Sequence, residues 1–325
     1  TLPAGLLIDR LGSKKLYVFA SLLPAALHVA ILCWSNWLWL AALRFLIGVC
    51  VPFRSVAMSG LFLQRLPQLG LNKAGWFRGS LMIGMLLAGP WLGGWLYEHF
   101  DALAFLWVAA SFAGMAFWGR KLWDQEQKLG NRKERSNNLR ALFHEPVLRV
   151  CCLIEGLSSA TSSLFATFIL VLCVEQLRWT QTQAVKLVAA QGLVTVLCLF
   201  LLSSKFSRLA PQRIYTFALA AACIALCLLG WLESFTGLAL VALLMSMASS
   251  AIHLANMGRL TTLSLDKGGV SGLFSLAQTL GMFCGSLFGG ILSHWLDMRQ
   301  LFPVWSVVVL FGSGLIYILS QSKIK

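Results

Sequence analysis

Ten apolar runs, each long enough to cross a lipid bilayer, constrain the fold of this chain more than any other feature. A membrane-spanning helix needs about 20 mostly apolar residues to cross a hydrocarbon core about 30 Å thick. The composition agrees, because hydrophobic residues make up 58% and charged residues only 12% of the chain, against ~25% charged residues in soluble domains. We therefore predict an all-α, polytopic membrane protein. The runs cover residues 16–34, 37–62, 79–98, 102–119, 147–173, 183–202, 214–232, 236–258, 270–293 and 301–320.

One polar break is much longer than the others and predicts the domain organisation. Residues 120–146 contain many basic and acidic side chains, as expected of a solvated linker, and an amphipathic helix in this segment would suit an anionic membrane surface. The short breaks elsewhere force antiparallel hairpins. We predict helical bundles at 1–119 and 147–325, joined by the linker at 120–146.

The positions of the basic residues predict the orientation. The net charge is +14, but the cations lie between the apolar runs, whereas a nucleic-acid groove would gather them on one folded face. Of 26 Lys and Arg residues, 21 lie on one side of the predicted membrane, three lie on the other (Arg178, Lys186 and Arg299), and Arg44 and Arg54 lie inside a span. Because cytoplasmic loops carry the excess of cations, the linker and the carboxyl terminus are predicted to be cytoplasmic, with no nucleic-acid partner.

Several kinds of site are missing from the sequence. The nine cysteines fall in or beside apolar runs without the CxxC spacing of metal sites, so we expect no metal and no cofactor. The sequence also lacks the GxxxxGK[ST], HExxH and GxSxG motifs. We therefore predict that the protein is not an enzyme and does not draw directly on ATP.

A charged loop precedes the first complete apolar run. Gly5 is followed by three apolar residues, an Asp-Arg pair, Leu11, Gly12 and two lysines. This pattern resembles the loop between the second and third transmembrane helices of the major facilitator superfamily; an ordinary charged loop is the alternative. The resemblance implies an inter-helix contact of Asp9 that forms in one transport state and breaks in the other. The residues assigned to this conformational motif are Gly5, Asp9, Arg10, Gly12, Lys14 and Lys15.

The position of the loop also bears on the fold. In the superfamily two helices precede this loop, so the resemblance implies ten complete transmembrane helices of an expected twelve. Residues 1–119 would then be the remainder of the amino-terminal bundle, and residues 147–325 the carboxy-terminal six-helix bundle. We therefore expect this sequence to be a fragment that lacks the first helix and most of the second.

Two motifs inside the spans strengthen the resemblance. Arg44, followed four residues later by Gly48, resembles the superfamily's membrane-embedded arginine; it is either a cation of the transport cavity or a structural arginine that snorkels. Residues 89–94, Gly-Pro-Trp-Leu-Gly-Gly, resemble a helix-kink motif of antiporter branches. Here the family's upstream glycine is replaced by Met85, and Gly84 lies one place out of register. The kink motif is assigned to Gly89, Pro90, Gly93 and Gly94, where proline bends the helix and the glycines let a neighbour approach.

Polar residues within the spans predict the transport pathway. Glu155 is the only carboxylate well inside an apolar run, and if unpaired it would take up a proton, which is the chemistry of a coupling site. Small polar residues follow Glu155 at helical spacing, and a second stripe includes His253, although a histidine satisfied within the core is the alternative. The glycines 281, 285 and 289 are expected to serve packing rather than binding. The residues assigned to the cavity or to coupling are Arg44, Glu155, Ser158, Ser159, Ser162, Ser249, His253, Asn256 and Gln278.

Together these features predict a secondary active transporter that works by alternating access. We favour proton-coupled efflux of amphipathic small molecules, as the resemblance to drug-proton antiporters implies. Uptake or export of a polar metabolite, such as a sugar or siderophore, is one alternative, and a transport-dead scaffold or receptor is another. The expected partners are a small-molecule substrate, protons and the lipid bilayer. We expect a monomer in the bacterial inner membrane.

Overall fold

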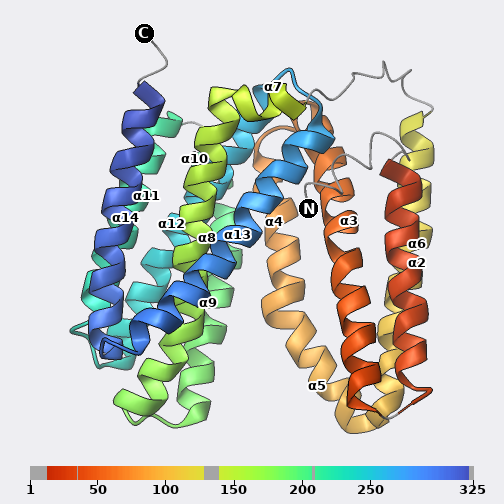
Figure 1. Ribbon diagram of the computed structural model, residues 1–325, viewed down its shortest axis with the longest axis horizontal. Helices are drawn as coiled ribbons and strands as arrows, with labels where there is room; N and C mark the ends of the chain where they lie inside the picture. Colours follow the sequence, from red (N-terminus) through yellow and green to blue (C-terminus); the bar gives the residue numbers. More distant parts are fainter. Residues whose placement is uncertain (1–12, 35, 128–138, 207–208, 322–325) are drawn as a thin grey trace. The chain divides into compact units, whose positions relative to one another are not determined.

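The computed structural model describes residues 13–34, 36–127, 139–206 and 209–321, and all regular structure in these residues is helical (Figure 1). The elements are α2 (Ser13–Ile31), α3 (Trp37–Leu69), α4 (Asn72–Met82), the π-helix η1 (Ile83–Ala88), α5 (Gly89–Phe100), the 3₁₀ turn η2 (Asp101–Leu103), α6 (Ala104–Gln127), α7 (Leu139–His144), α8 (Pro146–Val171), the π-helix η3 (Leu172–Gln176), α9 (Gln181–Leu201), α10 (Ser203–Phe206), α11 (Pro211–Leu229), α12 (Phe235–Thr262), α13 (Lys267–Ser293) and α14 (Met298–Gln321).

Each predicted membrane span is helical over most of its length. In the described chain, nine helical stretches are long and apolar enough to cross a membrane, and one of them, Asn72–Lys121, has 50 residues. This long stretch contains two of the predicted spans, because Asp101, with φ of 48°, turns the chain between α5 and α6. The prediction of an all-α polytopic membrane protein is therefore confirmed.

The described chain forms two compact units. The first comprises the described parts of Thr1–Arg65, Pro90–Leu142 and Ser264–Ser275, and the second comprises those of Leu66–Gly89, Phe143–Leu263 and Leu276–Lys325. These units interleave along the sequence and so do not coincide with the bundles predicted at 1–119 and 147–325. The division of the protein at a linker of residues 120–146 stays a prediction.

In the first unit, α2 lies along α6. The phenol ring of Tyr17 covers Gly119, where an added Cβ would collide with the ring. Tyr17 also belongs to a small buried cluster that includes Leu16 and, from α3, Val56 and Leu61. Glycine at position 119 is therefore what lets α2 and α6 pack this closely.

In the second unit, α12 is the most buried of the described spans and packs against α8, α9 and α11. Helix α14 completes the packing against α8 and α11. Phe165 of α8 and Phe302 of α14 are both fully buried and meet edge to face, with ring centroids 6.5 Å apart. This core fixes the positions of the polar side chains that α8, α12 and α13 contribute to the site below.

Candidate functional site

A buried carboxylate lies at the centre of the candidate site. Glu155 of α8 is 4% exposed. Its Oε1 lies 2.8 Å from Nδ1 of His253 and accepts a hydrogen bond from Nε2 of Gln278 at 2.6 Å, while its Oε2 accepts one from Nδ2 of Asn256 at 2.6 Å. The condition of an unpaired carboxylate is therefore not met, because three nitrogen-bearing side chains partner Glu155. Polar side chains that the sequence placed on three separate helices meet here.

Helix periodicity and close packing explain this meeting. His253 and Asn256 are three residues apart on α12, so both face α8. Gln278 comes from α13, which touches α8 through backbone: a Cβ added at Gly281 would collide with the carbonyl oxygen of Gly156, the residue after Glu155. The glycine at position 281 thus brings Gln278, one turn earlier, within reach of the carboxylate. The expected packing role of the glycines 281, 285 and 289 is confirmed, because a Cβ added at any of them would collide with a neighbouring helix.

A cation is also close to the carboxylate. Arg78 of α4 acts electrostatically on Glu155. Arg78 is one of the 21 cations that the sequence assigned to the polar connections, since it precedes the apolar run 79–98. This placement is wrong, because Arg78 lies within α4, which extends to Met82. The buried carboxylate thus has N–H donors at both oxygens and Arg78 as an electrostatic partner.

A second layer of polar groups surrounds Asn256. The hydroxyl of Tyr215, on α11, donates a hydrogen bond of 2.7 Å to Oδ1 of Asn256. Two further groups adjoin Tyr215: the Sγ of Cys151, 4.0 Å from the hydroxyl, and the guanidinium carbon of Arg259, 5.9 Å from the ring centroid. Tyr215 was not among the predicted site residues, since an aromatic residue near a helix end is ordinary in a membrane protein.

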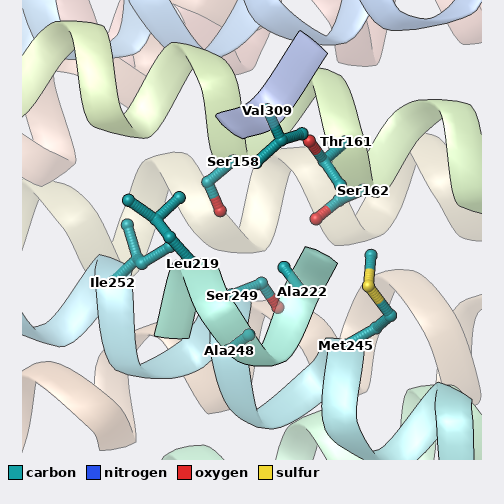
Figure 2. Close-up of a pocket in the computed structure, with 10 residues that line it drawn as sticks. All are labelled: Ser158, Thr161, Ser162, Leu219, Ala222, Met245, Ala248, Ser249, Ile252 and Val309. Atoms are coloured by element: carbon teal, nitrogen blue, oxygen red, sulfur yellow. The ribbon is translucent and has the colours of Figure 1, made fainter. Parts of the chain in front are cut away.

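A small pocket lies within the second unit (Figure 2). Three of the predicted polar residues, Ser158, Ser162 and Ser249, line it; Ser159 does not. The hydroxyl of Ser249 donates to the carbonyl of Ser246 at 3.2 Å, and Thr161 accepts a hydrogen bond of 3.2 Å from the indole of Trp305. Its full lining is Ser158, Thr161, Ser162, Leu219, Ala222, Met245, Ala248, Ser249, Ile252 and Val309.

In the first unit, Arg44 is exposed, and its guanidinium carbon lies 5.7 Å from the ring centroid of Phe105. Among the described residues it forms no ion pair with a carboxylate. Nearby, His28 is buried, with its Nδ1 2.7 Å from the carbonyl oxygen of Pro24 and its ring stacked on Phe112. His28 thus fits the alternative of a histidine satisfied within the core. The role of Arg44 stays a prediction.

The remaining predicted residues belong to the two sequence motifs. Gly5, Asp9, Arg10 and Gly12 lie outside the described residues, whereas Lys14 and Lys15 lie in the first turn of α2. In the described part of the chain, no group of three or more His, Cys, Asp and Glu side chains is placed to hold a metal. The conformational role of the first motif stays a prediction.

The kink motif follows a π-helical segment. The amide of Gly89 donates to the carbonyl of Gly84, five residues earlier, and a Cβ at position 89 would collide with that carbonyl oxygen. Pro90 follows directly. Cβ atoms added at Gly93 and Gly94 would meet nothing within 4 Å among the described residues, so the close helix approach expected there is not present in this part of the chain.

Comparison with curated proteins finds distant relatives. The chain is 25% identical over 324 residues to the multidrug resistance protein MdtG of Salmonella heidelberg (strain SL476), and the match covers 95% of this chain and 78% of that protein. The MdtG of Salmonella typhi matches with the same identity and coverage.

Solved structures share the fold at low sequence identity. The human organic anion transporter MFSD10 (TETRAN) matches with a TM-score of 0.75 and 18% identity, covering 98% of this chain and 79% of that chain. The E. coli fucose:proton symporter FucP matches with a TM-score of 0.75 and 13% identity, covering 98% and 86%. A bacterial homologue of the iron transporter ferroportin matches with a TM-score of 0.69 and 14% identity, covering 99% and 87%.

The family follows from a match to a family profile over most of the chain. The sequence profile of the Major Facilitator Superfamily matches residues 1–266, and the helical fold and the structural neighbours agree with it. The predicted resemblance is confirmed, as is the prediction that the protein is not an enzyme. The chain belongs to the Major Facilitator Superfamily, and it is a multi-pass membrane transporter.

Proposed function

We propose that this transporter exports amphipathic small molecules across the bacterial inner membrane in exchange for protons. The relatives named multidrug resistance proteins support export of such compounds. The observation that carries the proposal of proton coupling is the buried Glu155 with its partners His253, Asn256 and Gln278.

The site suits a proton that binds and leaves during the transport cycle. The three donors come from α12 and α13, whereas the carboxylate comes from α8. A shift of α8 against its neighbours would therefore remove donors from the carboxylate. An ionised carboxylate without donors is costly in a low-dielectric interior, so Glu155 would then bind a proton, and return of the donors would release it.

The cargo site is a separate matter. The pocket lined by Ser158, Ser162 and Ser249 has room for about one water molecule, so we do not assign the whole cargo to it. Its hydroxyl groups, together with Arg44 and Ser159, remain proposed contacts along the pathway. The aromatic side chains of the spans suit the apolar part of an amphipathic cargo.

The test uses the protein as the cell makes it, in inside-out membrane vesicles with an acidic interior and ethidium as the probe. The wild-type protein should accumulate ethidium until a protonophore dissipates the pH gradient. Glu155→Gln should lose this accumulation but keep the exchange of ethidium at equal concentrations on both sides. Glu175→Gln is the matched control, because Glu175 is an exposed carboxylate farther along the same helical run.

Two results would contradict the proposal. Accumulation by Glu155→Gln against a gradient would place the coupling proton elsewhere. Absence of any ethidium movement by the wild-type protein would reject this class of cargo, and uptake of a radiolabelled sugar in the same vesicles would then favour the polar-metabolite alternative. No flux of any solute would favour the scaffold or receptor alternative.

A further inference from the structure

Asn256 links the buried carboxylate to a tyrosine on a fourth helix. Its amide nitrogen donates to Glu155 and its amide oxygen accepts from the hydroxyl of Tyr215, at 2.6 and 2.7 Å. All three side chains are buried: Asn256 is 0%, Glu155 4% and Tyr215 7% exposed. A continuous hydrogen-bonded chain therefore runs from α11 through α12 to α8.

The two ends of an amide group are chemically opposite, and their assignment follows from the hydrogen-bond network. The nitrogen can only donate, so toward Glu155 it suits the ionised carboxylate. If the amide turned over, its oxygen would face Glu155 Oε2, and two acceptors would repel unless the carboxylate carried a proton. The orientation of Asn256 thus decides which protonation state of Glu155 is satisfied.

We propose that Tyr215 is a positioning residue for proton coupling: its hydroxyl holds the Asn256 amide in the orientation that donates to Glu155. The hydroxyl of Tyr215 is hydrogen-bonded to Asn256 rather than to Glu155, so it acts on the carboxylate through the amide. This inference rests on the proposed role of Glu155. The other titratable or charged groups at this site are Cys151 and Arg259 beside Tyr215, and His253 and Arg78 beside Glu155.

Loss of the hydroxyl should uncouple protons from cargo. In Tyr215→Phe the ring still fills its place on α11, but the amide of Asn256 can adopt both orientations. Both the protonated and the ionised forms of Glu155 are then satisfied in the same conformation, so the proton no longer commits the transporter to one state. We expect Tyr215→Phe to lose most of its pH-driven ethidium accumulation while it exchanges ethidium at the wild-type rate.

A double-mutant comparison tests whether the tyrosine acts through the amide. Asn256→Ala should show the same loss of driven accumulation, and adding Tyr215→Phe to it should cause no further loss. Cys151→Ala is the matched control, because it removes another polar neighbour of the hydroxyl but leaves the Tyr215–Asn256 hydrogen bond, and it should behave as wild type.

The outcomes separate this inference from the proposed function. Wild-type accumulation by Tyr215→Phe, an additional loss in the double variant, or a parallel loss of exchange in Tyr215→Phe would each overturn the positioning role. If Glu155→Gln loses accumulation in the same vesicles, the role of Glu155 stands regardless of these results. If Glu155→Gln accumulates ethidium normally, the proposed coupling site fails first.

Discussion

Replacing Glu155 by leucine should destabilise the protein, whereas replacing it by glutamine should not. Leucine offers no acceptor, so the donors on His253, Asn256 and Gln278 would all lose their partner. A side-chain hydrogen bond between membrane helices is worth about 0.6–2 kcal/mol. The loss of three such contacts lowers the free energy of unfolding by about 2–6 kcal/mol, and Arg78 would lose its opposite charge as well.

Glutamine can keep every hydrogen bond by a simple rearrangement. Its oxygen can accept from the amide nitrogen of Asn256, as Oε2 of Glu155 does. Its Nε2 then takes the place of Oε1 and can donate to the Gln278 amide, once that amide turns over, and to Nδ1 of His253 in the tautomer that leaves this nitrogen unprotonated. We therefore expect Glu155→Gln to lie within about 1 kcal/mol of the wild type, the worth of one net hydrogen bond.

The assay is thermal unfolding of the purified variants in one detergent, followed by intrinsic tryptophan fluorescence. Glu155→Leu should unfold at a clearly lower temperature than wild type, with Glu155→Gln close to wild type. A leucine variant as stable as wild type would show that these donors do not depend on the carboxylate. Equal destabilisation by both replacements would refute the rearrangement of Gln278 and His253.

Three further predictions concern helix packing, the sequence motif and topology. Gly285→Ala should cost about 1–3 kcal/mol by overpacking, because its Cβ would collide with the carbonyl oxygen of Ala160, whereas Gly290→Ala on the same helix meets nothing within 4 Å; thermal unfolding separates the two variants. Asp9→Asn should lower ethidium transport without reducing membrane insertion, measured as protein per vesicle, and normal flux would make the motif merely topological. Cysteines introduced into a cysteine-free background near Lys128 and at the carboxyl terminus should react only with cytoplasmic thiol reagents, and periplasmic labelling at either position would reverse the orientation.

The membrane spans could be predicted from sequence because an apolar run is a local property. The ends of the helices could not be predicted in the same way, since a helix can continue past the end of an apolar run into the polar phase. Helix α3 extends to Leu69, seven residues past the predicted run 37–62, and ends where Gly70 adopts φ of 85°. Arg78 was misplaced for the same reason: an arginine at the edge of an apolar run can lie in a loop or in a helix.

The candidate site was predictable only in its parts. Each polar side chain stands out against its apolar run, so Glu155, His253, Asn256 and Gln278 were all selected. Their meeting was not predictable, because it depends on how α8, α12 and α13 pack. Tyr215 gives no such signal in the sequence, since only the structure shows that its hydroxyl reaches Asn256.

The π-helical segment η1 changes how the kink motif should be compared with its family. A π-turn joins residues five apart, where an α-turn joins residues four apart, and the Gly89 amide is bonded to the Gly84 carbonyl. In a regular α-helix, the residue one turn before Gly89 would be Met85, four positions earlier. In this π-helical segment, Gly84 takes that place. The glycine that is out of register in the linear sequence is in register in space. The π-turn accommodates one residue more between the two glycines than an α-turn would, so a fixed spacing of four residues does not describe the motif in this chain.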